Sequence, residues 1–225
     1  MNIEPIAHIE TDFNEKFGIP RQSGRADKLT ATIVFEPKFH DGAALDGIEK
    51  FSHLWLIFDF SENHREHLLP TVRPPRLGGN KRVGVFASRS PFRPNFMGLS
   101  AVKLESVVKT PHRGTVLIVS GADLLNGTPI YDIKPYIPYT DSIPDADGSY
   151  AEEHSNHSLE VTDPLNLLSA LPKSKKDAAI QCIADDPRPA YNDDPERIWG
   201  MSFAGFNINF KVDGNIATIT AVDKI

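Results

Sequence analysis

The chain has a single cysteine, Cys182, among its 225 residues. An internal disulfide is therefore impossible, and this cysteine usage is typical of a reducing compartment, so a cytoplasmic protein is expected. The longest apolar run covers only residues 54–58, whereas about 20 apolar residues are needed to span a bilayer. Neither a membrane span nor a signal peptide is therefore expected.

Several motifs that would mark common enzyme classes are also missing. No G-x-G-x-x-G follows a predicted strand, which argues against a Rossmann cofactor domain, and no G-x-S-x-G provides a nucleophile elbow. The pairs His64/His67 and His154/His157 lack cysteine or carboxylate partners at metal-binding spacing, so no metal is expected. Cys182 lies in AAIQCIA, a pattern typical of a buried small apolar residue.

Acidic residues are absent from residues 71–94, although the chain has a formal net charge of -6. We call these residues the basic stretch; its cations are Arg73, Arg76, Lys81, Arg82, Arg89 and Arg93. Its four prolines stiffen the backbone, and guanidinium groups on a rigid loop suit recognition of phosphate or carboxylate. An ordinary solvated loop is the alternative interpretation.

Short β-rich segments separated by glycine and proline predict a mainly antiparallel β-barrel or closed sheet. Within these β-rich segments, one weak helical turn is expected, at residues 43–50. The expected strands cover residues 3–10, 30–35, 53–60, 83–87, 99–108, 115–120 and 130–137, with the apolar run 53–60 expected to be covered on both faces.

The composition becomes polar and acidic after residue 140 and then amphipathic. Residues 164–184 have helical spacing, and Asp163 is an expected N-cap. Asp213-Gly214-Asn215 predicts a hairpin between strands 208–212 and 216–222. We therefore expect a β-barrel domain at 1–140, a linker at 141–162 and a small α+β unit at 163–225 that packs on the first domain.

Five motifs keep a particular order along almost the whole chain: EKFGIPRQSG at 15–24, FSHLWLIF at 51–58, TVRPPRLGGNKRVGVFASRSPFRPN at 71–95, LLNGTPIYDIKPYIPY at 124–139 and DPRPAY at 186–191. Together they resemble the tRNA-methyltransferase O family. The resemblance implies a small non-Rossmann β-barrel that binds S-adenosylmethionine. It also implies N6-methylation of threonylcarbamoyl-adenosine at position 37 of certain threonine tRNAs, and a homodimer with its pocket near the subunit interface.

The resemblance also implies a set of cofactor-binding positions. Carried over by motif, they are Gln22, Ser23, Gly24, Ser61, Glu62, Arg89, Leu99, Ile130, Tyr131, Asp132 and Ile133. Two departures affect this set, since other members often have Pro-Gly where this chain has Ser23-Gly24, and proline where it has Phe96. Phe96 is expected to alter its loop, because proline would fix the backbone angle there.

Asp132 is the candidate catalytic carboxylate, with Tyr131 or Tyr136 as an orienting or stacking partner. The alternative for Asp132 is a strand-end ion pair with Lys134 or Arg89. Two or more cations of the basic stretch are expected to contact phosphates of the anticodon stem-loop; the candidates are Arg73, Arg76, Lys81, Arg82 and Arg93. The alternative is that some of them lock the stretch onto the domain through backbone carbonyls and carboxylates.

Two other function classes stay open from the sequence. One is a non-catalytic nucleotide- or tRNA-binding module, and the other is a methyltransferase for another acidic substrate.

Overall fold

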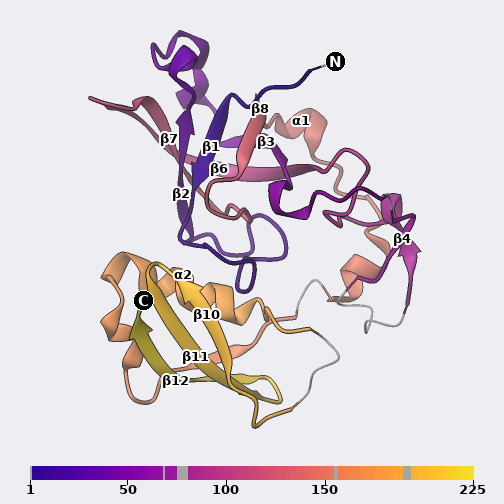
Figure 1. The fold of residues 1–225 in the computed structure, drawn as a ribbon, viewed down its shortest axis with the longest axis vertical. Coiled ribbons are helices and arrows are strands. Elements are labelled where there is room, and N and C mark those ends of the chain that lie inside the picture. The colour runs from indigo at the N-terminus through magenta and orange to yellow at the C-terminus, as the bar shows by residue number, and fades with distance from the viewer. Residues whose placement is uncertain (1, 68, 75–80, 155–156, 190–193) are drawn as a thin grey trace.

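The computed structural model describes residues 2–67, 69–74, 81–154, 157–189 and 194–225. Two sheets dominate these residues, one in each half of the chain, and Figure 1 shows them as an upper and a lower unit. None of the helices in these ranges is long and apolar enough to cross a membrane.

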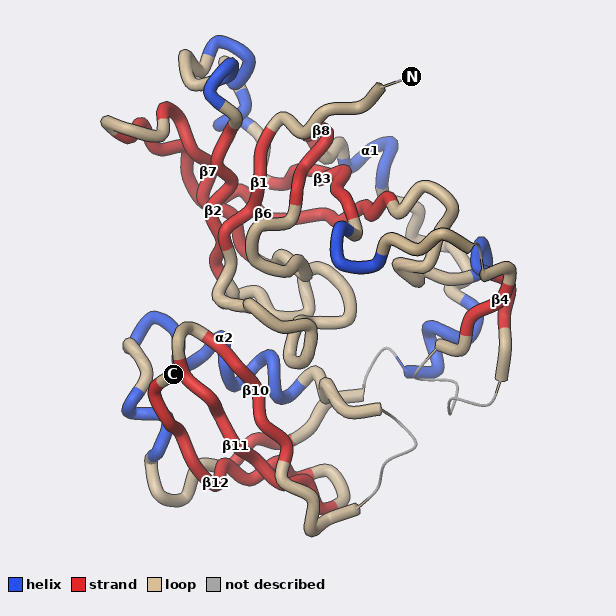
Figure 2. Tube along the Cα trace, viewed as in Figure 1, coloured by secondary structure: helices blue, strands red, loops and turns tan. Residues whose placement is uncertain are grey.

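The N-terminal unit is built on six antiparallel strands in the order β1-β2-β7-β6-β3-β8, drawn in red in the upper unit of Figure 2. The order returns to its start because β8 pairs with β1, through Ala7 with Ile130 and His8 with Pro129. The expected mainly antiparallel β fold without a Rossmann sheet is confirmed. The strands are β1 Ala7–Glu10, β2 Thr30–Phe35, β3 His53–Asp59, β6 Met97–Thr110, β7 Gly114–Ser120 and β8 Pro129–Pro135.

Strand β3 illustrates why this sheet forms. Leu54, Leu56 and Phe58 alternate along it and are buried in the core, whereas Trp55 and Ile57 are only half-buried. The apolar character of residues 53–60 predicts a strand covered on both faces. That prediction is wrong, because only one face of β3 is fully buried. A separate small sheet of β4 Thr71–Val72 and β5 Val83–Gly84 lies in the basic stretch.

The C-terminal unit is a four-stranded sheet in the order β10-β11-β12-β9, covered by helix α2. Ala178, Ala179, Cys182 and Ile183 form the buried face of α2, the i, i+1, i+4, i+5 spacing of an amphipathic helix. The hairpin predicted at Asp213-Gly214-Asn215 is present between β11 and β12. Its elements are β9 Glu160–Thr162, α2 Lys173–Ala184, β10 Trp199–Phe203, β11 Phe206–Asp213 and β12 Ile216–Lys224. Helix α1, Pro138–Asp141, belongs to the N-terminal unit, where Trp55 Nε1 of β3 donates to Asp141 Oδ2 at 3.1 Å.

The helix predicted from Pro164 begins much later, at Lys173. Pro172 lacks a backbone N–H and holds the preceding Leu171 in an extended conformation, with ψ of 153°. Asp163 is therefore not the N-cap of α2; its side chain instead binds the first turn of a short 3-10 helix at Leu167–Ala170, whose N-cap residue is Asn166. Its carboxylate oxygens accept from the backbone N–H groups of Leu167 and Leu168 at 2.7 and 2.9 Å.

Other expected elements differ mainly at their ends. Strand β1 begins at Ala7 rather than residue 3, residues 85–87 form a 3-10 turn, and the turn at 43–50 consists of two short 3-10 helices. The sequence did not predict β4, β9 or β10, and β9 lies within residues 141–162, the expected linker. The division at 140 and 163 remains a prediction.

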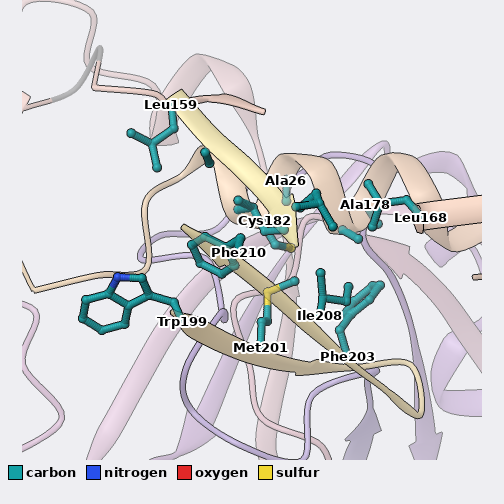
Figure 3. Close-up of a cluster of buried hydrophobic side chains, with 14 of the residues drawn as sticks. Ala26, Leu159, Leu168, Ala178, Cys182, Trp199, Met201, Phe203, Ile208 and Phe210 are labelled. Carbon is teal, nitrogen blue, oxygen red and sulfur yellow. The ribbon is translucent and has the colours of Figure 1, made fainter. Parts of the chain in front are cut away.

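The connection from β1 to β2, residues 11–29, links the two units. Phe13, Ala26 and Leu29 of this connection belong to the apolar core of the C-terminal unit. Figure 3 places Ala26 beside Cys182 of α2, and the rings of Phe13 and Phe203 lie 5.1 Å apart. The small unit thus packs on the first domain, as expected, and it does so through the connection 11–29, whose apolar residues complete its core.

Candidate functional site

A cavity of about 620 Å³ lies beside the N-terminal sheet. Its walls come from the connection 11–29, the end of β3 and the turn after it, the SRSPFRP part of the basic stretch, the start of β6, and residues 123–128. Its size falls in the usual range of small-molecule pockets, roughly 300–1,000 Å³. Loops from distant parts of the sequence therefore meet at one end of the sheet.

Five of the predicted cofactor-binding residues line this cavity. They are Gln22, Ser61, Glu62, Arg89 and Leu99. Arg89 Nη1 donates to Gln22 Oε1 at 2.6 Å, so the first and third motifs are joined by a direct side-chain hydrogen bond. Leu99 lies on a strand, lines the cavity and is 55% exposed.

Ser23 and Gly24 do not line the cavity; their backbones bind residues 121–123 next to the cavity wall. The backbone of Ser23 hydrogen-bonds to the carboxylate of Asp123, and Gly24 N donates to Gly121 O at 2.9 Å. Gly24 has a φ of +78°, which glycine adopts readily. A Cβ on Gly121 would lie 3.2 Å from the Gly24 Cα, so these two backbones are closely packed.

The β8 residues Ile130 to Ile133 are not part of the cavity wall in the single chain. Ile130 is fully buried in the core, and Ile133 packs against the same core. Asp132 pairs with Lys134, with Oδ2 and Nζ 2.9 Å apart, which is the ion pair considered as the alternative to a catalytic role. Its other oxygen accepts from Ile133 N at 3.0 Å.

Tyr131 reaches the cavity wall indirectly, through Asp59. Burial and the neighbouring Asp59 carboxylate, which shares a hydrogen bond with the phenol, raise the pKa of Tyr131. Asp59 ends β3, is 7% exposed, lines the cavity and also accepts from His64 Nε2 at 2.8 Å. Sequence reasoning missed Asp59, whose only signal was a carboxylate inside the apolar run HLWLIFDF.

A second carboxylate of the wall, Asp123, was also missed. Burial raises its pKa, against the opposing effects of a hydrogen bond from Ser100 and the positive charge of Arg89. Ser100 Oγ donates to its Oδ1 at 2.6 Å. Residues 121–127, GADLLNG, are typical of an ordinary turn, so the local sequence gives no sign of this carboxylate's burial.

Phe96 does change its loop, as expected from its departure from the family pattern. Its φ is +49°, an angle that the ring of proline excludes. The Phe96 carbonyl accepts from Phe60 N at 2.8 Å, and its ring lies 4.6 Å from that of His64. This conformation therefore packs directly against the His64–Asp59 pair at the edge of the cavity.

The predicted RNA-contacting cations fall into two groups. Arg73, Lys81 and Arg82 are exposed, and Arg82 Nη1 donates to Thr71 Oγ1 at 2.9 Å. Arg93 is half-buried, lines the cavity and donates to Ser88 O at 2.7 Å, so it locks the stretch in the way the alternative described. Arg76 lies outside the described residues.

Among the residues described, no three histidine, cysteine, aspartate or glutamate side chains are grouped so that they could hold a metal ion. Cys182 is buried in α2 as predicted, and burial raises the pKa of its thiol.

The cavity combines charges of both signs with apolar surface. Asp59 and Asp123 contribute carboxylates, Arg89 and Arg93 contribute guanidinium groups, and the remaining wall includes Phe58, Phe60, Met97 and Leu99. This combination suits a ligand that carries an anionic group, a cationic group and an aromatic or apolar part.

Comparison with known proteins agrees with this geometry. The tRNA-methyltransferase O N-terminal domain matches residues 8–142, and the TrmO C-terminal domain matches residues 158–225. The chain is 38% identical over 218 residues to the tRNA (adenine(37)-N6)-methyltransferase of Escherichia coli K12, covering 93% of this chain and 92% of that protein. A Pseudomonas aeruginosa relative, 38% identical over 93% of this chain and 91% of its own length, carries the provisional name of an S-adenosylmethionine-dependent methyltransferase, RcsF.

A solved structure of TrmO from P. aeruginosa superposes with a TM-score of 0.80 at 31% identity, covering 100% of this chain and 97% of that one. The chain belongs to the tRNA-methyltransferase O family.

Proposed function

We propose that this protein methylates N6 of threonylcarbamoyl-adenosine at position 37 of threonine tRNA, using S-adenosylmethionine bound in the 620 Å³ cavity. The coarser assignment follows from family membership: the chain is an S-adenosylmethionine-dependent tRNA adenine-37 N6-methyltransferase. The observation that carries the proposal is the convergence of Gln22, Ser61, Glu62, Arg89 and Leu99 on one cavity.

The chemistry of the wall fits this cofactor. Arg89 can pair with the carboxylate of the methionine part, since guanidinium groups recognise carboxylates with a planar fork of donors. Asp59 and Asp123 supply acceptors for its cationic groups, while Phe58, Phe60 and Leu99 offer apolar surface for the adenosine. The cofactor supplies a methyl group already activated by the sulfonium, so no covalent enzyme intermediate is required.

The chain's main contribution to rate is orientation. Holding the N6 nitrogen in line with the methyl carbon can supply roughly 7–11 kcal/mol. Methylation of N6 would release its proton, and a nearby carboxylate would accept it. Asp132 remains our proposed acceptor. Tyr131 or Tyr136 remains our proposed stacking or orienting partner, and the phenol of Tyr131 acts through its hydrogen bond with Asp59. Because the Asp132 side chain is 46% exposed in the middle of β8 and does not line the cavity, its action requires a site that extends over this strand.

A homodimer would provide such an extension. Large apolar side chains stay exposed on the N-terminal unit, including Phe86 at 77% and Tyr139 at 91%. We therefore propose a two-fold dimer with the cavity near the subunit interface. Light scattering should give twice 24.9 kDa, and a particle of 24.9 kDa at micromolar concentration would reject the dimer.

The decisive experiment is the nucleoside profile of tRNA from a strain that lacks the protein. Methylated threonylcarbamoyl-adenosine should be missing in cytoplasmic threonine tRNA and should return with the intact gene. An unchanged profile together with measurable tRNA binding would support a non-catalytic module instead. Methylation of another acidic molecule would support the second alternative.

A further inference from the structure

The loop that carries Gln22 is held by the C-terminal unit as well as by its own sheet. Gly18, just before this loop, has a φ of +97°, and a Cβ there would lie 2.5 Å from the Met201 side chain of β10. Together with Ala26 in the C-terminal core, Gly18 fixes residues 19–25 at the boundary between the two units. Both ends of the loop are therefore packed against the C-terminal unit.

One buried carboxylate spans this loop. Asp185, at the end of α2, is 5% exposed. Its Oδ2 accepts from Arg21 N at 3.0 Å, and its Oδ1 accepts from Arg25 Nε at 2.7 Å. The two oxygens thus hold the two ends of the segment 22–24, which both supplies and supports the cavity wall.

Asp186 reinforces the same contact through its backbone. The guanidinium group of Arg21 donates to the carbonyl of Asp186, with Nη2 and O 3.1 Å apart, and also to the carbonyl of Arg188. The Asp186 side chain in turn accepts from Arg188 Nε at 2.8 Å and from His157 Nε2 at 2.9 Å. Asp186 and Arg188 therefore bind the Arg21 side chain through their carbonyls and are themselves held together by their side-chain hydrogen bond.

The opposite side of the loop faces the proposed cofactor site. Gln22 and Arg21 line the cavity, and Gln22 accepts from Arg89. A loop fixed before binding does not have to be ordered by the ligand, and this lowers the entropic cost of binding. We propose that Asp185 is a positioning residue, through which the C-terminal unit sets the affinity of the cavity for S-adenosylmethionine. This inference rests on the cofactor site proposed above.

Two substitutions of Asp185 test this role in the full-length protein. Asp185→Ala removes both contacts, whereas Asp185→Asn keeps an acceptor for Arg21 N and loses the charge that faces Arg25. We expect S-adenosylmethionine to bind at least tenfold more weakly to Asp185→Ala in calorimetric titration, with Asp185→Asn intermediate. The KM for S-adenosylmethionine should rise in the same order, while kcat at saturating cofactor and the KM for tRNA stay near those of the unsubstituted protein.

Gln181→Ala is the matched control, because Gln181 joins the same two units outside the segment 20–25. It accepts from Lys28 N at 2.9 Å and donates to Asp27 at 2.6 Å. We expect cofactor affinity within about twofold of the unsubstituted protein. An equal loss in this variant, or an Asp185→Ala variant that is folded and binds normally, would overturn the proposal.

Arg25→Ala breaks the same contact from the loop side, so the test stands even if Asp185→Ala does not fold. Weaker cofactor binding in a folded Arg25→Ala supports the role of Asp185, and unchanged binding contradicts it. If the unsubstituted protein does not bind S-adenosylmethionine, the cofactor site itself is wrong and this inference falls with it. If the unsubstituted protein binds S-adenosylmethionine and only the Asp185 and Arg25 variants bind it more weakly, both the cofactor site and the role of Asp185 are supported.

Discussion

Arg89 connects two loops that are 67 positions apart in the sequence, through its hydrogen bond to Gln22. Replacing it with alanine removes the guanidinium that we assign to the cofactor carboxylate and also releases the Gln22 amide. We expect binding of S-adenosylmethionine to weaken about tenfold, which corresponds to about 1.4 kcal/mol. Calorimetric titration measures this directly.

Arg82→Ala is the appropriate comparison for this prediction. Arg82 belongs to the same basic stretch, but its hydrogen bond goes to Thr71 and it does not line the cavity. Its replacement should leave cofactor affinity unchanged. Normal affinity in a folded Arg89→Ala would remove Arg89 from the cofactor site.

The sequence led to Gln22 and Arg89 because their motifs have a recognisable order, but it did not lead to Asp59 or Asp123. The chemical role of a carboxylate depends on how deeply it is buried and on which groups lie next to it. Both are determined only when segments distant in the sequence come together. Asp59 gains its importance from His64 and Tyr131, and Asp123 from Ser100 and Arg89. Neither set of neighbours can be read from local spacing.

The same limit applies to secondary-structure elements. Strands of the N-terminal sheet were predictable from short β-rich apolar segments between glycine and proline residues, as in β3 and β7. Strand β9 has only three residues and pairs in parallel with residues of β12 that lie 56 positions further along the chain, so its sequence carries little local signal. Residues 164–172 have helical spacing, but Pro172 stops the helix from extending across them.

Gly18 tests how strongly the connection 11–29 depends on the C-terminal sheet. Alanine at this position must adopt a φ of +97° and displace the buried Met201 side chain, which lies 2.5 Å from the new Cβ. Strain and overpacking together should lower the free energy of unfolding by roughly 2–4 kcal/mol. Denaturant unfolding gives this value.

Gly47→Ala separates backbone strain from packing. Gly47 has a φ of +87°, but a Cβ there meets nothing within 4 Å. Its loss should be about 1 kcal/mol, from the left-handed backbone alone. Equal losses at the two positions would mean that contact with Met201 contributes nothing.

Asp186, at the boundary between the two units, makes the stability of the folded protein depend on pH in the acidic range. Burial acts to raise the pKa of Asp186, but hydrogen bonds from Arg188 and His157 outweigh it and leave the pKa below the ordinary 3.8. Ionised Asp186 therefore stabilises the folded state above pH 3.8, and this contribution is lost as the pH falls through the lowered pKa.

We expect Asp186→Asn to be less stable than the unsubstituted protein by a constant amount at neutral and mildly acidic pH. Asparagine tolerates the φ of +52° at this position, so the charge is the main change. The difference in unfolding free energy should shrink below about pH 4. Unfolding curves at a series of pH values measure it, and a difference that persists undiminished at pH 2 would contradict the assignment.

At the scale of the whole molecule, a chain with a net charge of -6 must attract an anionic tRNA through local positive charge. The structure divides the cations of the basic stretch by their environment. Arg73 and Lys81 are exposed, whereas Arg93 donates to the backbone carbonyls of Ser88 and Val85. Only the exposed cations are well placed to meet phosphates.

Replacing Arg73 and Lys81 together with alanine should therefore weaken tRNA binding and make its dependence on salt shallower. Each lost phosphate contact should reduce the slope of log K against log salt concentration by about 0.7–0.9 units. Arg93→Ala should instead lower the melting temperature, because it leaves carbonyls of the stretch without their donor, and should keep the slope of the unsubstituted protein. Filter binding at several salt concentrations, with a melting curve for each variant, distinguishes the two effects. An unchanged slope in a stable Arg73→Ala/Lys81→Ala variant would mean that these cations do not contact the RNA.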